Sequence, residues 1–236
     1  MTDLTDLTTL ANKFAQAEPQ AVIAWAVTTY HPQLALASSF GAEDMVLIDM
    51  LYKICPTGRV FTLDTGRLPN ETYELIANVQ RKYKTLQLDI YYPQTEAVQE
   101  MVRTKGINLF YESVENRKLC CQVRKVEPLG RALQGLRAWL TGIRRDQTLN
   151  RQSMQVIEWD ETHQLVKINP LIDWRAEQVW AYIRQNFVPY NALHDRNYAS
   201  IGCAPCTRAV QPGEDPRAGR WWWEQGNQEC GLHVKK

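Results

Sequence analysis

Apolar residues recur along this chain with two different periods. Near the N-terminus, Leu4, Leu7, Leu10 and Phe14 lie three or four positions apart, which predicts an amphipathic helix. Short apolar runs then alternate with longer segments of helical period. The predicted strands are residues 34–38, 59–64, 86–92 and 136–141, and the predicted helices are residues 19–29, 43–54, 71–83, 95–104 and 116–133, the last interrupted at Pro128.

This alternation of strand and helix predicts an α/β fold, with a mostly parallel, twisted sheet and helices on both of its faces. Residues 155–160 and 165–171 should form a hairpin after the fourth strand. Asp173 should then cap a helix that runs to about Asn186.

The pattern weakens toward the C-terminus. Beyond Gly202, cysteine, proline, glycine and tryptophan are frequent and no period persists. We therefore expect a domain over residues 1–207, followed by a flexible tail over residues 208–236.

Charge and composition exclude several classes of function. The chain has 27 Lys and Arg against 26 Asp and Glu, a formal net charge of +1, which does not favour a nucleic acid or an anionic membrane as partner. The N-terminus lacks the apolar core of a signal peptide, and no apolar run is long enough to span a bilayer. We therefore expect a cytoplasmic protein with neither a nucleic-acid nor a membrane partner.

Three polar loops follow predicted strands and are candidates for binding an anionic nucleotide. The first could aim backbone N–H groups at an anion, although it is neither a Walker nor a Rossmann motif. Two adjacent arginines in the third suit a phosphate or sulfate group. The candidate residues are Ser38, Ser39, Gly41, Glu43 and Asp44 in the first loop, Asp64, Thr65, Gly66 and Arg67 in the second, and Arg144 and Arg145 in the third. Each loop alone also fits an ordinary turn, but three loops at the carboxyl ends of strands favour one ligand site.

Four of the six cysteines form two close pairs, Cys120 with Cys121 and Cys203 with Cys206. Four thiolates from two segments can bind a tetrahedral zinc ion or a [4Fe–4S] cluster. Neighbours on a regular helix diverge by about 100°, so Cys120 and Cys121 reach one centre only if that centre is large or the helix is distorted. This favours a cluster, with zinc or two unrelated cysteine pairs as the alternatives.

The other two cysteines are isolated in the sequence. Cys55 is expected to be structural. Cys230 lies six residues before the C-terminus, with His233 shortly after it and Arg217 and Arg220 upstream. A thiolate nucleophile needs such cationic surroundings and the freedom to reach a substrate. The position alone also fits an incidental cysteine.

Seven segments together carry a resemblance to a known family. They are SSFGAED, LDTGRL, CC-x-x-RK, TGIRRDQ, IGCAPCTRAV, GRWWWE and ECGLH. From about Ala35 to His233, the chain resembles the assimilatory adenylyl-sulfate (APS) reductases of iron–sulfur type, within the APS/PAPS reductase family. PAPS is the 3′-phosphorylated form of APS. Members that use PAPS typically lack both cysteine pairs and tend to carry a large aromatic residue at the position of Arg67, so the resemblance favours APS.

The resemblance implies an adenine nucleotide α-hydrolase-like fold, related to that of the PP-loop ATP pyrophosphatases. It implies a [4Fe–4S] cluster with Lys125 close to it, and Cys230 as the catalytic nucleophile assisted by His233. The implied cluster ligands are Cys120, Cys121, Cys203 and Cys206, and the implied substrate-binding residues include Ser38, Ser39, Gly41, Glu43, Asp44, Arg144, Arg217 and Arg220.

The resulting hypothesis is reduction of APS to sulfite and AMP, as part of assimilatory sulfate reduction toward cysteine. The Cys230 thiolate would attack the sulfur of APS, and thioredoxin or glutaredoxin would release sulfite from the S-sulfocysteine formed. We also expect a homo-oligomer. Three alternatives remain: use of PAPS, alone or together with APS; a PP-loop enzyme that adenylates a substrate with ATP; and a non-catalytic zinc- or cluster-binding protein.

Overall fold

The computed structural model describes residues 4–148 and 151–224 as eight α-helices, six strands and several short helical turns. The helices are α1 (Leu4–Phe14), α2 (Pro19–Tyr30), α3 (Ala42–Ile54), α4 (Asn70–Lys82), α5 (Thr95–Lys105), α6 (Val114–Cys121), α7 (Glu127–Leu133) and α8 (Ala176–Gln185). The strands are β1 (Leu34–Ala37), β2 (Arg59–Leu63), β3 (Gln87–Tyr91), β4 (Ala138–Leu140), β5 (Ile157–Asp160) and β6 (Leu165–Ile168). Within these described ranges, no helix is long and apolar enough to cross a membrane.

All six strands belong to one sheet in the order β3-β2-β1-β4-β6-β5. Every neighbouring pair is parallel except β5 and β6, which form the predicted antiparallel hairpin. On one side of β1 lie β2 and then β3. On the other side of β1 the sheet continues with β4, followed by β6 and β5. Ligands of open α/β sheets bind at such a reversal of strand order, beyond the carboxyl ends of the strands. Here that point lies between β1 and β4.

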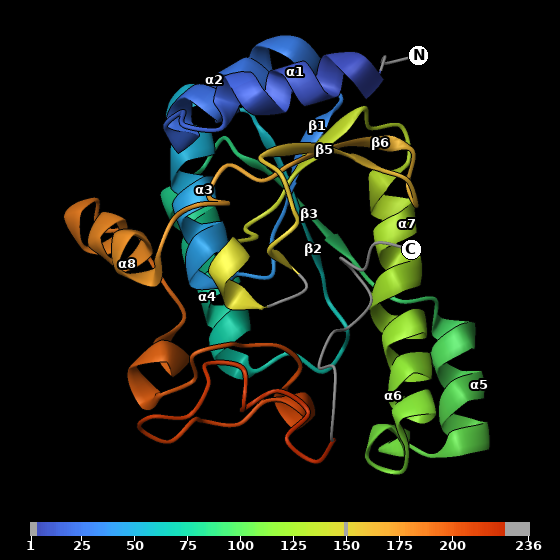
Figure 1. Cartoon of the computed structure of the whole chain (residues 1–236). Coiled ribbons are helices and arrows are strands. Elements are labelled where there is room, and N and C mark those ends of the chain that lie inside the picture. Colours follow the sequence, from blue (N-terminus) through green and yellow to red (C-terminus); the bar gives the residue numbers. More distant parts are fainter. Residues whose placement is uncertain (1–3, 149–150, 225–236) are drawn as a thin grey trace.

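Helices cover both faces of the sheet, as the sequence predicts (Figure 1). Alternate side chains of a strand point to opposite faces. Leu34 and Leu36 pack in the larger core beside α2, α3, α4 and α8, whereas Ala35 packs in a second core with Leu129 of α7. The central strand is therefore buried on both sides, which explains why its sequence is a continuous apolar run rather than an alternating pattern.

The helix predicted around Pro128 differs from the observed one. The helical column does not break at the proline. Instead, α6 and α7 are joined by a π-helical segment, η2 (Gln122–Val126), and Pro128 lies within the first turn of α7. Proline lacks an N–H donor and clashes with the carbonyl four residues earlier, and a wider turn relieves both problems. The distortion therefore begins directly after Cys121.

The start of α8 also differs from prediction. Asp173 does not cap this helix, because Arg175 occupies the N-cap position and the helix begins at Ala176. The side chain of Gln178 accepts a hydrogen bond from the Arg175 N–H at 2.8 Å. Asp173 instead forms an ion pair with Arg145. The Asp173 carboxylate, although close to the start of the helix, thus makes a tertiary ion pair and does not cap the helix.

The segment after α8 contains two short 3-10 helices, η5 (Ala192–Arg196) and η6 (Ala204–Cys206). Thr207 and Arg220 form an antiparallel bridge, and the Trp221 side chain is 1% exposed. Residues 217–221, which belong to the expected tail, thus pack against the rest of the chain, whereas residues 211–216 are exposed. The domain boundary at residue 207 stays a prediction.

Candidate active site

A cleft of about 370 Å³ lies at the reversal of strand order, where the loops after β1 and β4 meet. Its floor includes the apolar side chains of Phe61, Leu129 and Trp139. Ten of the residues that the sequence singled out line it: Ser38, Ser39, Gly41, Glu43, Asp44, Thr65, Lys125, Arg144, Arg217 and Arg220. An apolar floor with polar and cationic walls is typical of a site for a small anionic ligand.

The loop after β1 is held in shape by Asp44. One oxygen of this buried carboxylate accepts hydrogen bonds from the N–H of Ser39 at 2.6 Å, the Ser39 hydroxyl at 2.9 Å and the N–H of Gly41 at 3.4 Å. Burial raises the pKa of Asp44 to about 6, although the hydrogen bonds from Ser39 act in the opposite direction. The N–H groups of Ser39 and Gly41 therefore donate their hydrogen bonds to Asp44. This carboxylate positions the loop that forms one wall of the cleft.

Gly142, which the sequence did not single out as a ligand residue, lets the loop after β4 approach Asp44. A Cβ atom at position 142 would overlap the Asp44 carboxylate oxygen and would lie 3.1 Å from the Cβ of Glu43. Gly142 also lines the cleft. The available signal was a glycine placed directly at a predicted strand end, within the segment TGIRRDQ.

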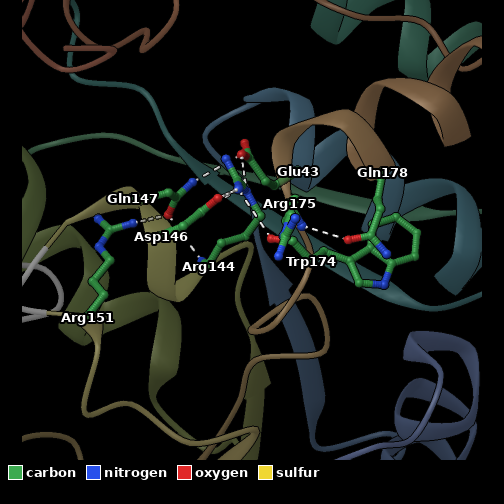
Figure 2. A network of polar contacts seen from close by, with 8 residues as sticks. All are labelled: Glu43, Arg144, Asp146, Gln147, Arg151, Trp174, Arg175 and Gln178. Atoms are coloured by element: carbon green, nitrogen blue, oxygen red, sulfur yellow. Dashed lines mark hydrogen bonds and ion pairs between the residues drawn. The ribbon is translucent and has the colours of Figure 1, made fainter.

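Arg144 is the centre of a charged network on the same wall (Figure 2). Its Nε donates to Glu43 Oε1 at 2.8 Å, and its Nη1 bonds both carboxylate oxygens of Asp146 at 2.5 and 2.6 Å. Gln147 donates to Glu43 Oε1 at 3.1 Å and accepts from the Arg144 N–H at 3.1 Å. The Arg144 side chain is 9% exposed, so the network fixes the direction of its guanidinium along the cleft.

Two predicted ligand arginines lie away from the cleft. Arg145 pairs with Asp173 and donates to the carbonyl of Met154 at 3.0 Å. Arg67 donates to the carbonyl of Ile107 at 3.1 Å and to Asn108 at 3.0 Å, and it lies over the ring of Phe110. The structure therefore places Arg67 beside the cysteines rather than among the cleft residues.

The loop after β2 joins the cleft to the cysteines. Asp64 is buried and accepts from the N–H of Gly66 at 2.8 Å and from the Tyr73 hydroxyl at 2.9 Å, so it shapes this loop. The Thr65 hydroxyl lines the cleft side and lies 3.2 Å from the sulfur of Cys203. The Thr65 carbonyl accepts a hydrogen bond from Arg124 at 2.6 Å. Neither connection has a local sequence signal.

All four paired cysteines lie around one small cavity of about 20 Å³. Cys120 and Cys121 end α6, Cys203 is the N-cap residue of η6 and Cys206 ends it, and each is at least partly buried. Four guanidinium or ammonium groups line the same cavity, those of Arg67, Arg117, Arg124 and Lys125. Among the described residues, no three His, Cys, Asp or Glu side chains converge closely enough to hold a single metal ion. Four thiols surrounded by cationic side chains match the ligands of an anionic iron–sulfur cluster better than the ligands of a single metal ion such as zinc.

The thiols around this cavity have unequal electrostatic surroundings. Burial raises the pKa of Cys206 to about 12, and the neighbouring Cys203 thiolate adds to this effect. Burial also raises the pKa of Cys120. Burial acts on Cys203 in the same direction, but Lys125 and the hydrogen bond with Thr65 outweigh it, so the pKa of Cys203 is lowered. Cations around the cavity thus favour thiolate at the cysteine nearest the cleft.

The cavity and the cleft are neighbours. Lys125 and Trp221 line both, and the segment from residue 199 to residue 206 runs along the cleft and continues into the cysteines. Gly202 has no space for a side chain, because a Cβ atom there would overlap the guanidinium of Arg220. The Arg220 guanidinium also lies over the Trp221 ring, 4.6 Å from its centroid. Arg220 is thereby held between the two sites.

A buried ion pair fixes the end of the described chain. Arg117 of α6 bonds Glu224 through two nitrogen atoms at 2.9 Å each, with side chains 2% and 6% exposed. Arg117 also lies over the ring of Trp221. Cys230 and His233 lie outside the described residues.

Replacing Arg117 with glutamine should lower the free energy of unfolding by about 3–5 kcal/mol, because Glu224 would remain buried without its cation. Urea denaturation followed by circular dichroism measures this loss. Arg103→Gln is the matched control, since its pair with Glu100 is exposed on α5 and should contribute less than about 1 kcal/mol. Equal losses in the two variants would contradict the structural role of the buried pair.

Comparison with known proteins identifies the family. Residues 33–209 match the phosphoadenosine phosphosulfate reductase domain, three quarters of the chain. The chain belongs to this family. It is therefore an enzyme of the class that reduces sulfonucleotides, an oxidoreductase acting on a sulfur group.

Two similar relatives and two solved structures extend this finding. Adenosine 5′-phosphosulfate reductase of Allochromatium vinosum is 53% identical over 86% of this chain and 79% of its own length. The Pseudomonas aeruginosa protein of the same name is 44% identical over 97% of this chain and 87% of its own. The crystal structure of phosphoadenylyl-sulfate reductase from Candida auris is 35% identical, with a TM-score of 0.75 over 89% of this chain and 98% of that one. Yeast FAD synthetase shares the fold alone, at 11% identity and a TM-score of 0.56 over 85% of this chain and 73% of that one.

Proposed function

We propose that this chain reduces adenosine 5′-phosphosulfate to sulfite and AMP in the cytoplasm, with Cys230 as the nucleophile and a [4Fe–4S] cluster on the four paired cysteines. The single observation that carries the proposal is the adjacency of two sites. A cleft lined by Arg144, Arg217 and Arg220 shares Lys125 with a cavity lined by four cysteines. The names of the bacterial relatives support APS as the substrate.

The cleft residues would bind and orient the substrate. Adenine is apolar and flat, and the floor of Phe61, Leu129 and Trp139 offers an apolar surface for it. The guanidinium groups of Arg144 and Arg220 would bind phosphate and sulfate oxygens through charge-assisted hydrogen bonds. In this arrangement Glu43 and Asp146 hold Arg144 in place before the substrate arrives. Such preorganisation lowers the cost of stabilising charge in the transition state.

The chemical step needs a nucleophile and a leaving group. The Cys230 thiolate attacks the sulfur atom of APS, the bond from that sulfur to the bridging phosphate oxygen breaks, and AMP leaves with the electron pair. An S-sulfocysteine remains on the enzyme. One thiolate of a dithiol protein such as thioredoxin or glutaredoxin then attacks the Cys230 sulfur and releases sulfite. The second thiol of that protein resolves the mixed disulfide and frees Cys230.

The cluster would be held by Cys120, Cys121, Cys203 and Cys206, and it would supply an anionic charge next to the cleft. The π-helical segment after Cys121 supports this assignment, because it provides the distortion that two adjacent ligands require. Lys125 and Arg124 would offset that charge and position the cleft wall. In this proposal, Lys125 would couple the two sites electrostatically, since it lines both.

Mass spectrometry of the intact protein tests the proposal. Incubation with APS in the absence of any reductant should add the mass of one SO3 group, located on Cys230 after proteolysis. An unmodified Cys230 under these conditions would refute the proposed intermediate.

A second candidate function is reduction of PAPS, alone or beside APS. The likeness to the Candida auris enzyme favours testing it, since that protein is a phosphoadenylyl-sulfate reductase. Arg67 does not help to distinguish APS from PAPS, because it lines the cysteine cavity and not the cleft. Sulfite release measured from APS and PAPS side by side should show a higher kcat/KM for APS. A higher value for PAPS would overturn the substrate assignment.

The cluster has its own expected signature. Protein purified without oxygen should be brown, with broad visible absorption and about four iron atoms per chain. Cys206→Ala should lose this absorption because it removes one thiolate ligand, whereas Cys55→Ala should keep it. Cys55 is the matched control, since it lies at the end of α3 beside Thr57. A colourless protein with one bound zinc ion would contradict the assignment.

A further inference from the structure

A group of aromatic rings, two of them exposed and one partly buried, lies beside the cysteine cavity. We call it the aromatic patch, made of Tyr111, Trp222 and Trp223. The ring of Trp223 lies 4.5 Å from that of Tyr111 and 4.8 Å from that of Trp222, measured between centroids. Tyr111 belongs to the short helix η1 (Leu109–Tyr111), so two distant segments build the patch.

The patch presents apolar area to solvent. Trp222 is 41% exposed and Tyr111 is 43% exposed, whereas the adjacent Trp221 is 1% exposed. Tryptophan and tyrosine are the residues most enriched at the centres of protein–protein interfaces. Exposed rings of this kind are typical of a surface that binds another protein.

Hydrogen bonds hold the patch in place and connect it to the cysteine site. The Tyr111 hydroxyl donates to the carbonyl of Pro205, which lies between two of the paired cysteines, at 2.8 Å. Trp223 Nε1 donates to the carbonyl of Phe110 at 3.2 Å. The buried pair of Arg117 and Glu224 holds the chain directly after Trp223. A surface already fixed in this way loses little conformational entropy when a partner binds.

The short stretch of sequence between Glu224 and Cys230 limits where the reductant of Cys230 can bind. Cys230 follows Glu224 by six positions in the sequence, and six residues of fully extended chain span at most about 20 Å. A folded protein whose dithiol attacks the Cys230 sulfur must therefore work within that distance of the patch.

We propose that the aromatic patch is the docking surface for the dithiol protein that releases sulfite from Cys230. The inference rests on the proposed function and adds the site of its protein partner. An apolar surface around the partner's dithiol packs on Trp222 and Tyr111. Its thiolate then attacks the Cys230 sulfur, sulfite leaves with the electron pair, and the partner is oxidised to its disulfide.

Steady-state kinetics with reduced thioredoxin tests the docking surface. Trp222→Ala should raise the KM for thioredoxin on the order of tenfold, as expected for the loss of an aromatic interface anchor. Its KM for APS should not change. The rate with a small dithiol, dithiothreitol, should match that of the unaltered enzyme, because a small molecule does not need the patch. Phe187→Ala is the control, since this ring is 86% exposed but follows α8, a helix on the other side of the sheet from α6 (Figure 1).

The outcomes differ in which step a variant slows: formation of the S-sulfocysteine, or its reduction by thioredoxin. An unchanged KM for thioredoxin in Trp222→Ala, and also in the double variant with Tyr111→Phe, would overturn the proposal. Slower formation of the S-sulfocysteine in Trp222→Ala would also overturn it, since the patch would then serve the chain's own tail. A change in oligomer mass would assign the patch to a second copy of the chain and would overturn it as well. Absence of the S-sulfocysteine in the unaltered protein would refute the proposed function instead.

Discussion

Replacing Cys230 with serine should reduce sulfite release from APS by at least about 10³-fold, because loss of a catalytic nucleophile removes the whole covalent route. A serine hydroxyl is not ionised at neutral pH, and an O-sulfo group could not be resolved by thiol attack on sulfur. The KM for APS should change little, since the cleft residues that bind the nucleotide remain in place. Sulfite release with thioredoxin as reductant measures the rate.

Cys55→Ser is the matched control for this prediction. It removes one thiol at the end of α3, which lies 3.9 Å from the Thr57 hydroxyl and packs at the edge of the larger core, and it should retain nearly full activity. The visible absorption of both variants should equal that of the unaltered protein, because neither residue is among the four paired cysteines. Sulfite release by Cys230→Ser at a rate near that of the control would contradict the role of Cys230.

Replacing Gly142 with alanine should reduce kcat/KM for APS by about 100-fold, the effect expected when reacting groups are displaced by about 1 Å. The added methyl group would overlap the Asp44 carboxylate, so either the loop after β4 or the loop after β1 must move. Asp44 holds the N–H groups of Ser39 and Gly41, and its displacement would disturb the wall of the cleft. Kinetics with APS, together with APS binding by isothermal titration, measure the loss.

Gly130→Ala is the corresponding control. Gly130 lies within α7, and beyond its chain neighbours and the backbone of its own helix no heavy atom of the described residues lies within 4 Å of the Cβ position there. This variant should keep full activity and gain about 0.5–1 kcal/mol of stability, because alanine costs less backbone entropy in a helix than glycine. If Gly142→Ala folds and keeps an activity within twofold of Gly130→Ala, the close approach at Asp44 does not organise the site.

The fold class followed from local sequence patterns. The alternation of apolar runs and helical periods predicted a parallel sheet with two helical layers, and the structure confirms it. Periodicity works here because it reports which side of each element is buried, a property decided within about ten residues. Helix ends were less well predicted. Asp173 was predicted to cap a helix, but it pairs with Arg145 instead. Pro128 was predicted to interrupt a helix, but the preceding π-helical segment accommodates it.

The composition of the site was also largely visible in the sequence. Ten of the singled-out residues line one cleft, and the four paired cysteines line one cavity. The carboxyl ends of parallel strands lie at one edge of a sheet, so loops that follow strands are brought together by the topology itself. The roles of individual cleft residues and the parts played by Cys230 and His233 stay predictions.

What the sequence by itself determined is the family, the α/β architecture and the set of residues that carry chemistry. What only the tertiary structure decided is which of those residues line the cleft, which line the cysteine cavity and which support the loops. Asp44 holds a loop, Arg67 lies with the cysteines, and an aromatic patch forms beside them. The physical reason is separation along the chain. Thr65 meets Cys203 across 138 positions and Arg117 meets Glu224 across 107, and no local period can report contacts that form only when the layers pack.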